Sequence, residues 1–298
     1  MHVYLTGATG FIGSRVIDQL LEAGHQVTGS TRSEEGARRL AKRGVTPYSA
    51  TLEDPAALAR GAEQADAVIH TAFDHEFVNF AANCEKDRRV ISALGAVLRG
   101  SSRPILITSG VGMGDPGDGS LAREEVFNRS HSMPRVASEL AGQDLLDAGV
   151  NLGVVRLPQV HDPVKQGLIT PYIDLAREKG TVAYIADGAN RFAAAPVEDV
   201  ARLYVSALER AAPGARYHAV AEEGVALREI AEVVAAGMGL PAVSLSPDEA
   251  RTHFGWFAMF AAANFAASGA WTKQTLGWQP KGPSLLENLR RMDYAPVA

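Results

Sequence analysis

The stretch VYLTGATGFIGSRVIDQLL, residues 3–21, constrains the possible folds more than any other part of the chain. It places Gly7, Gly10 and Gly13 directly after an apolar run and at the start of an amphipathic helical pattern. Glycine permits a tight turn, lets main-chain N–H groups approach a phosphate, and allows the helix to pack closely on the strand. The N-terminus of that helix adds positive potential. We therefore expect a dinucleotide pyrophosphate to bind here, in contact with Gly7, Thr9, Gly10, Phe11, Ile12 and Gly13.

The first 160 residues alternate short β-branched runs with longer helical patterns, which is typical of βαβ units and a parallel sheet. We expect strands at residues 2–7, 25–31, 46–51, 66–72, 104–110 and 151–158. Helices are expected between them, at 12–19, 34–43, 55–61, 77–99 and 136–148. Residues 1–160 are thus predicted to form a nucleotide-binding domain of the α/β class.

Residues 161–298 follow a less regular pattern, which we interpret as a small mixed α/β lobe that binds the substrate. Helices are expected near 167–179, 197–211, 226–238 and 247–267, with short strands at 182–186 and 215–220. Some of these later elements are expected to return to the first domain, so that the two parts interleave. The uncharged segment 254–271 is shorter than a membrane-spanning helix of about 20 residues and favours a buried, pocket-lining or interface helix.

The end of the second predicted strand indicates which dinucleotide is bound. An acidic residue there accepts hydrogen bonds from the ribose of NAD, whereas a basic residue accommodates the 2′-phosphate of NADP. The sequence GSTRS puts Thr31 in the acidic position and Arg32 after it. A guanidinium can hold a phosphate by paired, charged hydrogen bonds. NADP(H) is therefore the favoured cofactor, although Arg32 could instead be a solvated loop charge, with its role taken by Arg15 or Arg38.

Composition excludes several classes of partner. The net charge of -5 disfavours a general nucleic-acid binder, which needs clustered Lys and Arg. Cys84 is the single cysteine, so no intrachain disulfide or multi-cysteine metal site can form, and no metal is predicted. The N-terminus MHVYLTGATG does not read as a secretion signal. We expect a cytoplasmic protein that acts on a small molecule, without membrane or nucleic-acid partners.

The glycine loop, DAVIHTA, PILITSG, VVRLPQVHDP, ANRFAAAPVEDVARLY and the late LGWQP together resemble the extended short-chain dehydrogenase/reductase superfamily over nearly the whole chain. The resemblance implies a Rossmann-type, doubly wound parallel sheet of about seven strands with a small C-terminal lobe. It implies that Leu52 lies near the adenine, and that Leu157 to Val160, including Pro158 and Val160, pack against the nicotinamide. Thr71, Ala72 and Phe73 would lie near the middle of the cofactor, and Thr108 is also expected beside it. Members of the family often form homodimers.

The departures from that family concern its catalytic residues. Typical members use a Ser or Thr after the fifth strand, and then a Tyr with a Lys four residues later on the next helix. The tyrosines of this chain are at positions 4, 48, 172, 184, 204, 217 and 294, and none has Lys four residues on. The sequence RVASE places Arg135 and Glu139 in the two positions. In TSG, Gly110 replaces the hydroxyl residue and leaves Ser109 beside it. We therefore expect an atypical active site.

Hydride transfer requires a group that stabilises negative charge on the acceptor atom. The guanidinium of Arg135 could do so, although its pKa of more than about 12 prevents it from donating a proton. His131 and His161 are candidate proton donors, because an imidazole titrates near physiological pH. Glu139 could accept hydrogen bonds from the ribose. The alternative for Arg135 and Glu139 is a surface ion pair worth at most about 0.5 kcal/mol.

Three functions remain open from the sequence. The favoured one is an NADPH-dependent reductase of a carbonyl, C=N or C=C group in a small apolar molecule, with Arg135, Glu139, Ser109 and His161 as catalytic residues. The second is a regulator that binds NADP(H) without turnover. A sugar-nucleotide epimerase or dehydratase is the third, and it is disfavoured because it needs the missing tyrosine.

Overall fold

A seven-stranded sheet forms the centre of the molecule, in the order β10-β6-β5-β4-β1-β2-β3. The computed structural model describes residues 1–295. Every paired strand of this sheet is parallel. Its strands are β1 (His2–Thr6), β2 (Gln26–Thr31), β3 (Thr46–Ser49), β4 (Ala67–His70), β5 (Ile105–Gly110), β6 (Leu152–Leu157) and β10 (Arg216–His218). The predicted Rossmann-type α/β class is confirmed.

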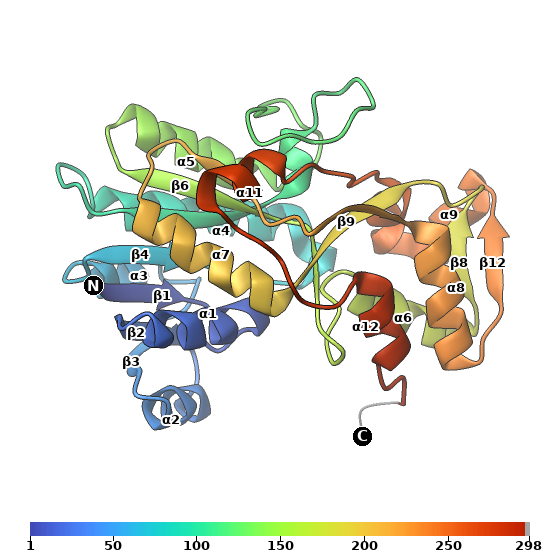
Figure 1. Cartoon of the computed structure of the whole chain (residues 1–298), viewed down its shortest axis with the longest axis horizontal. Coiled ribbons are helices and arrows are strands. Elements are labelled where there is room, and N and C mark those ends of the chain that lie inside the picture. The colour runs from blue at the N-terminus through green and yellow to red at the C-terminus, as the bar shows by residue number, and fades with distance from the viewer. Residues whose placement is uncertain (296–298) are drawn as a thin grey trace.

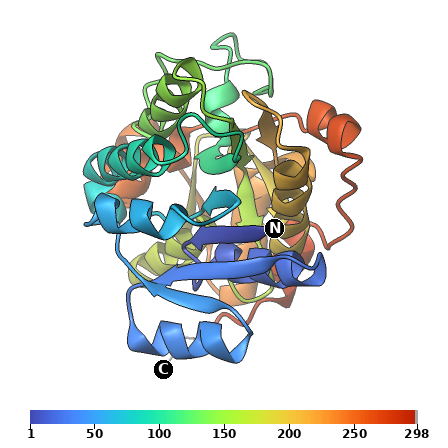
Figure 2. The same ribbon diagram turned by 90° about the vertical axis from the view of Figure 1, so that its left-hand side faces the viewer.

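Helices cover both faces of the sheet, as the burial of its apolar strands requires. On one face α1 (Phe11–Glu22) packs against α7 (Val197–Arg210), and on the other α4 (Phe80–Ala96) lies between α3 (Pro55–Ala62) and α5 (Val136–Asp147). The helix α2 (Glu34–Lys42) lies against β3, at one end of the sheet (Figures 1 and 2). Its first turn is capped by the Ser33 hydroxyl, which accepts a hydrogen bond from the Gly36 N–H.

The right-hand side of Figure 1 is a smaller mixed lobe. Its strands are β7 (Gln159–His161), β9 (Arg191–Pro196) and β11 (Glu222–Ala226) in one sheet, and the parallel pair β8 (Val182–Ile185) and β12 (Ala242–Leu245). Its helices are α6 (Ile169–Lys179), α8 (Leu227–Met238), α9 (Pro247–Phe254), α10 (Ala258–Ala262) and α12 (Leu285–Arg291). In the described part of the chain, no helix is both long and apolar enough to cross a membrane.

Two parts of the later sequence return to the central sheet. The strand β10, predicted at 215–220, pairs with β6 at the edge of the sheet, and α7 packs on α1. The helix α11 (Ala270–Leu276) contacts both α7 and β10.

The helix predicted over 247–267 is divided in the structure, because Gly255 takes a positive φ of 51° and ends α9. A 3₁₀ turn, Gly255–Phe257, then leads into α10.

The parallel arrangement brings the carboxyl ends of β1, β2, β4, β5 and β6 to one edge of the sheet. The chain leaves β1 for a helix on one face and reaches β4, its other neighbour, from a helix on the opposite face. Ligands of open α/β sheets bind at such a point. The loops after these strands therefore define where a functional site is to be sought.

Candidate dinucleotide and substrate site

The glycine loop has the geometry that a pyrophosphate needs. Gly7 has a positive φ of 71°, and a side chain there would come within 2.7 Å of the Ala72 backbone nitrogen. A side chain on Gly13 would come within 2.1 Å of the Gly7 carbonyl oxygen. Gly10 is the N-cap of α1 and offers no side-chain cap, so the N–H groups of Phe11 and Ile12 begin the helix uncapped. The residues present thus fit a bound phosphate.

The loop after β4 packs against the glycine loop and forms hydrogen bonds with Thr6, the residue before Gly7. The Thr71 hydroxyl donates to the Thr6 carbonyl oxygen at 2.7 Å, and the Ala72 N–H donates to Thr6 Oγ1 at 3.4 Å. Leu52 is half-buried and packs against the cluster of apolar side chains beneath α3 and α4. Thr71 and Ala72, which the resemblance predicts near the cofactor, lie against Gly7 of the glycine loop.

The end of β2 carries no carboxylate. Thr31 is 6% exposed, and its hydroxyl faces Ser33 at the start of α2 rather than the open edge. Arg32 is exposed and forms no ion pair within residues 1–295. Arg15, in contrast, pairs with Glu198 at 2.8 Å, and Arg38 pairs with Glu34 at 3.6 Å. Of the three arginines considered for a 2′-phosphate, Arg32 is the one with its charge available.

The end of β5 supplies Thr108 and Ser109. The Thr108 hydroxyl is used internally, since it donates to the His70 carbonyl oxygen and bonds the Tyr204 hydroxyl at 2.6 Å. Ser109 is in register with Arg156 of β6 and so points to the face that α5 covers. Its hydroxyl is buried and has no hydrogen-bond partner among the residues described.

Arg135 lies at the N-cap of α5, beside the end of β5. Its Nη1 donates to Asp87 Oδ2 at 2.8 Å and its Nη2 donates to the Thr108 carbonyl oxygen at 2.7 Å. The guanidinium carbon is 4.1 Å from the centroid of the Phe73 ring. The side chain is 12% exposed. Two of its five N–H groups are held in this way, which leaves others for a ligand.

Asp87, on α4, was not among the predicted site residues. Its Oδ1 accepts from His70 Nε2 at 2.9 Å, and its Oδ2 accepts from the Ser138 hydroxyl at 2.6 Å as well as from Arg135. Burial alone raises the pKa of a carboxyl, but Arg135, His70 and Ser138 outweigh it and hold the pKa of Asp87 below its usual range. Asp87 is therefore a buried carboxylate that keeps its charge.

Glu139 has a structural environment, which differs from the expected contact with a ribose. It is 1% exposed, and its two oxygens accept from Arg156 Nε at 2.7 Å and Nη2 at 2.8 Å. Arg216 adds a contact at 3.3 Å. The surface pair between Arg135 and Glu139 is not formed either, because each side chain has a closer partner on another element. Glu139 is therefore not retained as a site residue.

His161 is enclosed and does not suit the role of proton donor. It is 0% exposed, and its Nδ1 bonds Asn288 Nδ2 at 2.8 Å. Burial, only partly offset by Asp162 and Asp199, lowers its pKa to about 4, so the ring is neutral near pH 7. His131 is half-buried instead, and its Nδ1 accepts from the Met133 N–H at 3.0 Å. That bond places the proton on His131 Nε2.

The segment after β6 also differs in detail from the expectation. Pro158 is half-buried at the edge of the sheet, whereas Val160 is 4% exposed and belongs to the apolar core under the glycine loop. Any contact of Val160 with a cofactor would therefore involve its backbone. The following turn carries Lys165, whose Nζ lies 5.7 Å from the centroid of the Phe11 ring. Lys165 was missed because it lies outside every motif used in the sequence analysis.

Aromatic side chains continue from Arg135 toward the lobe. Phe73 contacts Phe80 edge-on, and Phe80 in turn contacts Phe260 of α10. Phe77 stacks on Trp256 with the ring planes 2° apart. Trp256 and Met259 are each 40% exposed. This aromatic cluster (Phe73, Phe77, Phe80, Trp256 and Phe260) is an apolar surface that begins at Arg135 and ends at solvent.

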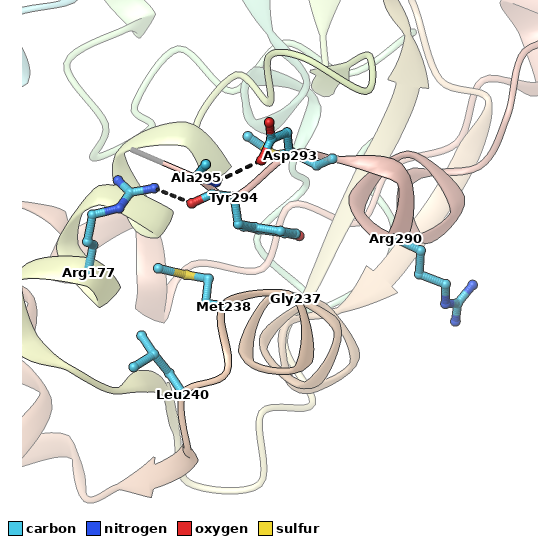
Figure 3. A pocket seen from close by; sticks show the side chains of 9 residues that line it. Arg177, Gly237, Met238, Leu240, Arg290, Asp293, Tyr294 and Ala295 are labelled. Carbon is cyan, nitrogen blue, oxygen red and sulfur yellow. Dashed lines mark hydrogen bonds between the residues drawn. The ribbon is translucent and has the colours of Figure 1, made fainter. Parts of the chain in front are cut away.

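A separate pocket lies in the lobe, between α6, α8, α12 and the segment that follows α12 (Figure 3). Its lining includes Arg177, Met238, Leu240, Arg290 and Tyr294. Arg177 Nη2 donates to the Tyr294 carbonyl oxygen at 3.3 Å. No residue of the glycine loop, and none near Arg135, lines this pocket. It is therefore distinct from the candidate site.

The fold, the uncapped α1 and the glycine loop define a dinucleotide-binding protein of the Rossmann class. Residues 3–220 match the NAD dependent epimerase/dehydratase family. The chain belongs to this family, and hence to the extended short-chain dehydrogenase/reductase superfamily. The resemblance seen in the sequence is thereby confirmed.

Individual relatives extend over most or all of the chain. An uncharacterized protein of Schizosaccharomyces pombe is 42% identical, covering 99% of this chain and 100% of its own. The 2-alkyl-3-oxoalkanoate reductase of Stenotrophomonas maltophilia is 28% identical, covering 82% of this chain and 77% of its own. The structure of a UDP-glucose 4-epimerase of Thermus thermophilus in complex with NAD superposes with a TM-score of 0.76 at 21% identity, covering 100% of both chains. At that identity the structural likeness supports the fold alone.

Proposed function

We propose that the protein is an NADPH-dependent reductase that acts on a carbonyl, C=N or C=C group of a small apolar molecule. The observation that carries this proposal is the position of Arg135. Its guanidinium is fixed by Asp87 and Thr108 at the start of α5, in the position that the resemblance assigns to the family's tyrosine. A positive group held in a partly dry site stabilises negative charge that develops on an acceptor atom. The site is thus atypical but still suited to reduction.

When bound, NADPH supplies the hydride, and the residues of this chain supply position and charge. The glycine loop would hold the pyrophosphate and Arg32 the 2′-phosphate. Arg135 would bind the atom that becomes negative, with Ser109 as a further hydrogen-bond donor. The proton would come from solvent water, since a neutral His131 offers its Nε2–H only as a hydrogen-bond donor and His161 is enclosed. The aromatic cluster beside Arg135 favours an apolar substrate.

One relative gives this proposal support from outside the chain. The Stenotrophomonas maltophilia protein is by name a reductase, and it aligns with most of this chain. We also propose that the protein is cytoplasmic, and a homodimer remains a prediction.

The proposal is tested by calorimetry with NADPH and NADH, followed by an NADPH-oxidation screen over apolar ketones, imines and enones. We expect tighter binding of NADPH than of NADH, and Arg32→Ala should reduce that difference at least tenfold, since one bidentate charged contact is worth about 1.5–3 kcal/mol. Turnover of at least one compound is expected. Tight binding with no turnover, together with capture of a protein partner, would support the regulator instead. Turnover of a sugar nucleotide would support the epimerase alternative.

A further inference from the structure

A continuous set of buried hydrogen bonds connects the glycine loop with Arg135. Thr6, the last residue of β1, bonds His70 Nδ1 through its hydroxyl at 2.6 Å. His70 Nε2 then bonds Asp87 Oδ1, and Asp87 Oδ2 holds Arg135. We name this set of four side chains, Thr6, His70, Asp87 and Arg135, the Asp87 chain. Thr6, His70 and Asp87 are each at most 1% exposed.

The bond directions in the Asp87 chain follow from the carboxylate of Asp87 and, at His70 Nδ1, apply to the neutral form of the imidazole. A carboxylate can only accept, so His70 Nε2 carries the proton that it donates to Asp87. In the neutral imidazole, Nδ1 then accepts from the Thr6 hydroxyl, whose oxygen accepts from the Ala72 N–H at 3.4 Å. Each donor thus has one acceptor, and none of the groups can rotate without breaking a bond. Such fixed second contacts orient the group that acts on a ligand.

We propose that Asp87 is a positioning residue that holds the Arg135 guanidinium toward the substrate, and that His70 and Thr6 link its position to the glycine loop. The inference rests on the proposed function of Arg135. Three observations carry it. Asp87 is buried on a helix face that is apolar apart from Asn83, its charge is matched by the partly exposed Arg135, and its second oxygen is fixed by a histidine that bonds the residue directly before Gly7.

Burying the Asp87 carboxylate costs desolvation free energy, which packing alone does not recover. Replacing a buried ion pair by apolar residues is often neutral or stabilising, so stability alone does not favour Asp87 at an apolar helix face. Arg135 has further anchors in Thr108 and Phe73, which fix the plane of the guanidinium. The bonds to Asp87 and Thr108 use two of its N–H groups and leave the others without a hydrogen bond to the described residues. This preorganisation is what an oxyanion-binding group requires.

A double-mutant cycle tests whether Asp87 acts through Arg135. Asp87→Asn keeps the size of the side chain but removes the charge, and we expect kcat to fall roughly 10- to 100-fold with the KM of NADPH changed less than about threefold. In an Arg135→Ala background, Asp87→Asn should change kcat less than about twofold. Glu85→Gln is the matched control, because it makes the same change on α4 in a surface pair with Arg88. Equal losses from Asp87→Asn in both backgrounds would overturn the proposal.

A second readout does not depend on turnover. Rotation of the Arg135 guanidinium can be followed by ¹⁵N NMR, with Arg135→Lys to assign its signals. We expect separate Nη signals in the wild-type protein and in Glu85→Gln, and one averaged signal in Asp87→Asn. Should Asp87→Asn fail to fold, Thr6→Val offers a milder change, since it leaves the pair of Asp87 and Arg135 intact but frees His70. In Thr6→Val we expect the two Nη signals of Arg135 to be partly averaged.

Unchanged Arg135 signals in whichever of these two variants folds would overturn the positioning role, whether or not a substrate has been found. Conversely, a wild-type protein that reduces nothing in the screen, but shows the expected signals, would remove the proposed reductase function and leave the positioning role standing. The two proposals can therefore fail separately.

Discussion

Two ion-pair networks lie one helical turn apart on α5, and they differ in what they contact. Arg135 pairs with Asp87 at the open edge of the sheet and is 12% exposed. Glu139 pairs with Arg156 and Arg216 beneath the helix, where the side chains of Glu139 and Arg156 are 0% exposed. The first network presents a cation to the candidate site. In the second, Glu139 and Arg156 are enclosed by protein, and Arg216 at its border is 15% exposed.

The partners of Arg156 explain what the second network does. Its Nη1 donates to the Val126 carbonyl oxygen at 2.8 Å and to the Arg123 carbonyl oxygen at 3.2 Å. It also bonds His218 Nε2 of β10 at 3.2 Å. One guanidinium thus joins α5, β6, β10 and the long segment between β5 and α5. The comparison shows that a guanidinium near this edge is structural where its nitrogens are all bonded within the protein, as at Arg156, and available to a ligand where N–H groups are left over, as at Arg135.

The largest effect is expected from Glu139→Gln. This change leaves Arg156 fully buried without its carboxylate, and breaking a buried pair costs about 3–5 kcal/mol. We expect the free energy of unfolding, measured by urea titration, to fall by that amount. Glu85→Gln, in a surface pair, should cost less than about 1 kcal/mol. If Glu139→Gln lowers the free energy of unfolding no more than Glu85→Gln does, the network around Glu139 does not have the structural role assigned to it.

Part of the acid sensitivity of the fold should come from His218, which bonds Arg156 in the enclosed network. Burial and then Arg156 lower the pKa of His218 to about 3, while the Ser268 carbonyl acts in the opposite direction. The unfolded chain takes up this proton near pH 6.5 and the folded chain does not, so the free energy of unfolding falls as the pH falls below 6.5 and continues to fall toward 3. Between pH 6.5 and 5 the loss reaches about 2 kcal/mol for one such histidine.

Urea midpoints at pH 7.5, 6 and 5 measure this loss. His218→Asn should reduce the slope of the free energy of unfolding against pH, because one proton fewer separates the folded and unfolded chains. His161, whose pKa is lowered to about 4, contributes with the same sign and remains in the variant. An unchanged slope in His218→Asn would contradict the assignment of acid sensitivity to this network.

The sequence was sufficient for the parts of the molecule that depend on local pattern. The glycine loop and the six strands of the first 160 residues were predicted, because apolar β-branched runs and glycine spacing are local properties. The strands β7, β9, β11 and β12 were not predicted. The run RFAAAP of β9, for example, lacks strong β formers, and it extends because it pairs with β7 and β11.

The sequence pointed to the glycine loop and to Arg135, but not to the side chains that hold Arg135 in place. Asp87 and Arg135 are 48 residues apart in sequence, and Glu139 and Arg156 are 17 apart, so helical spacing pointed to the wrong partners. A signal was nevertheless present. Asp87 falls among Cys84, Val90, Ile91 and Leu94 on the buried face of α4, and a charge on such a face needs a partner. Arg156 inside the apolar strand β6 gives the same signal.

The network at the open edge should respond to Arg135→Lys in turnover more than in stability. Lysine keeps the charge opposite Asp87 but cannot bond Asp87 and the Thr108 carbonyl with one planar group. We expect kcat to fall roughly tenfold, which corresponds to about 1.4 kcal/mol, while the free energy of unfolding changes by less than about 1 kcal/mol. Steady-state kinetics and urea titration on one preparation separate the two. A loss of stability without loss of kcat would assign Arg135 to the same structural class as Glu139.

The smallest effect is expected from a substitution at Lys165. It tests whether this cation, like those after β2 and β5, contributes to cofactor binding. Its Nζ lies near the Phe11 ring at the start of α1, and within residues 1–295 it has no carboxylate partner. A cation there would attract the cofactor phosphates through solvent, so Lys165→Met should raise the Kd of NADPH about threefold to fivefold and reduce its dependence on salt. Lys42→Met, at the exposed end of α2, is the control. If both variants bind NADPH as the wild type does, the cations that matter at this edge are confined to the loops after β2 and β5.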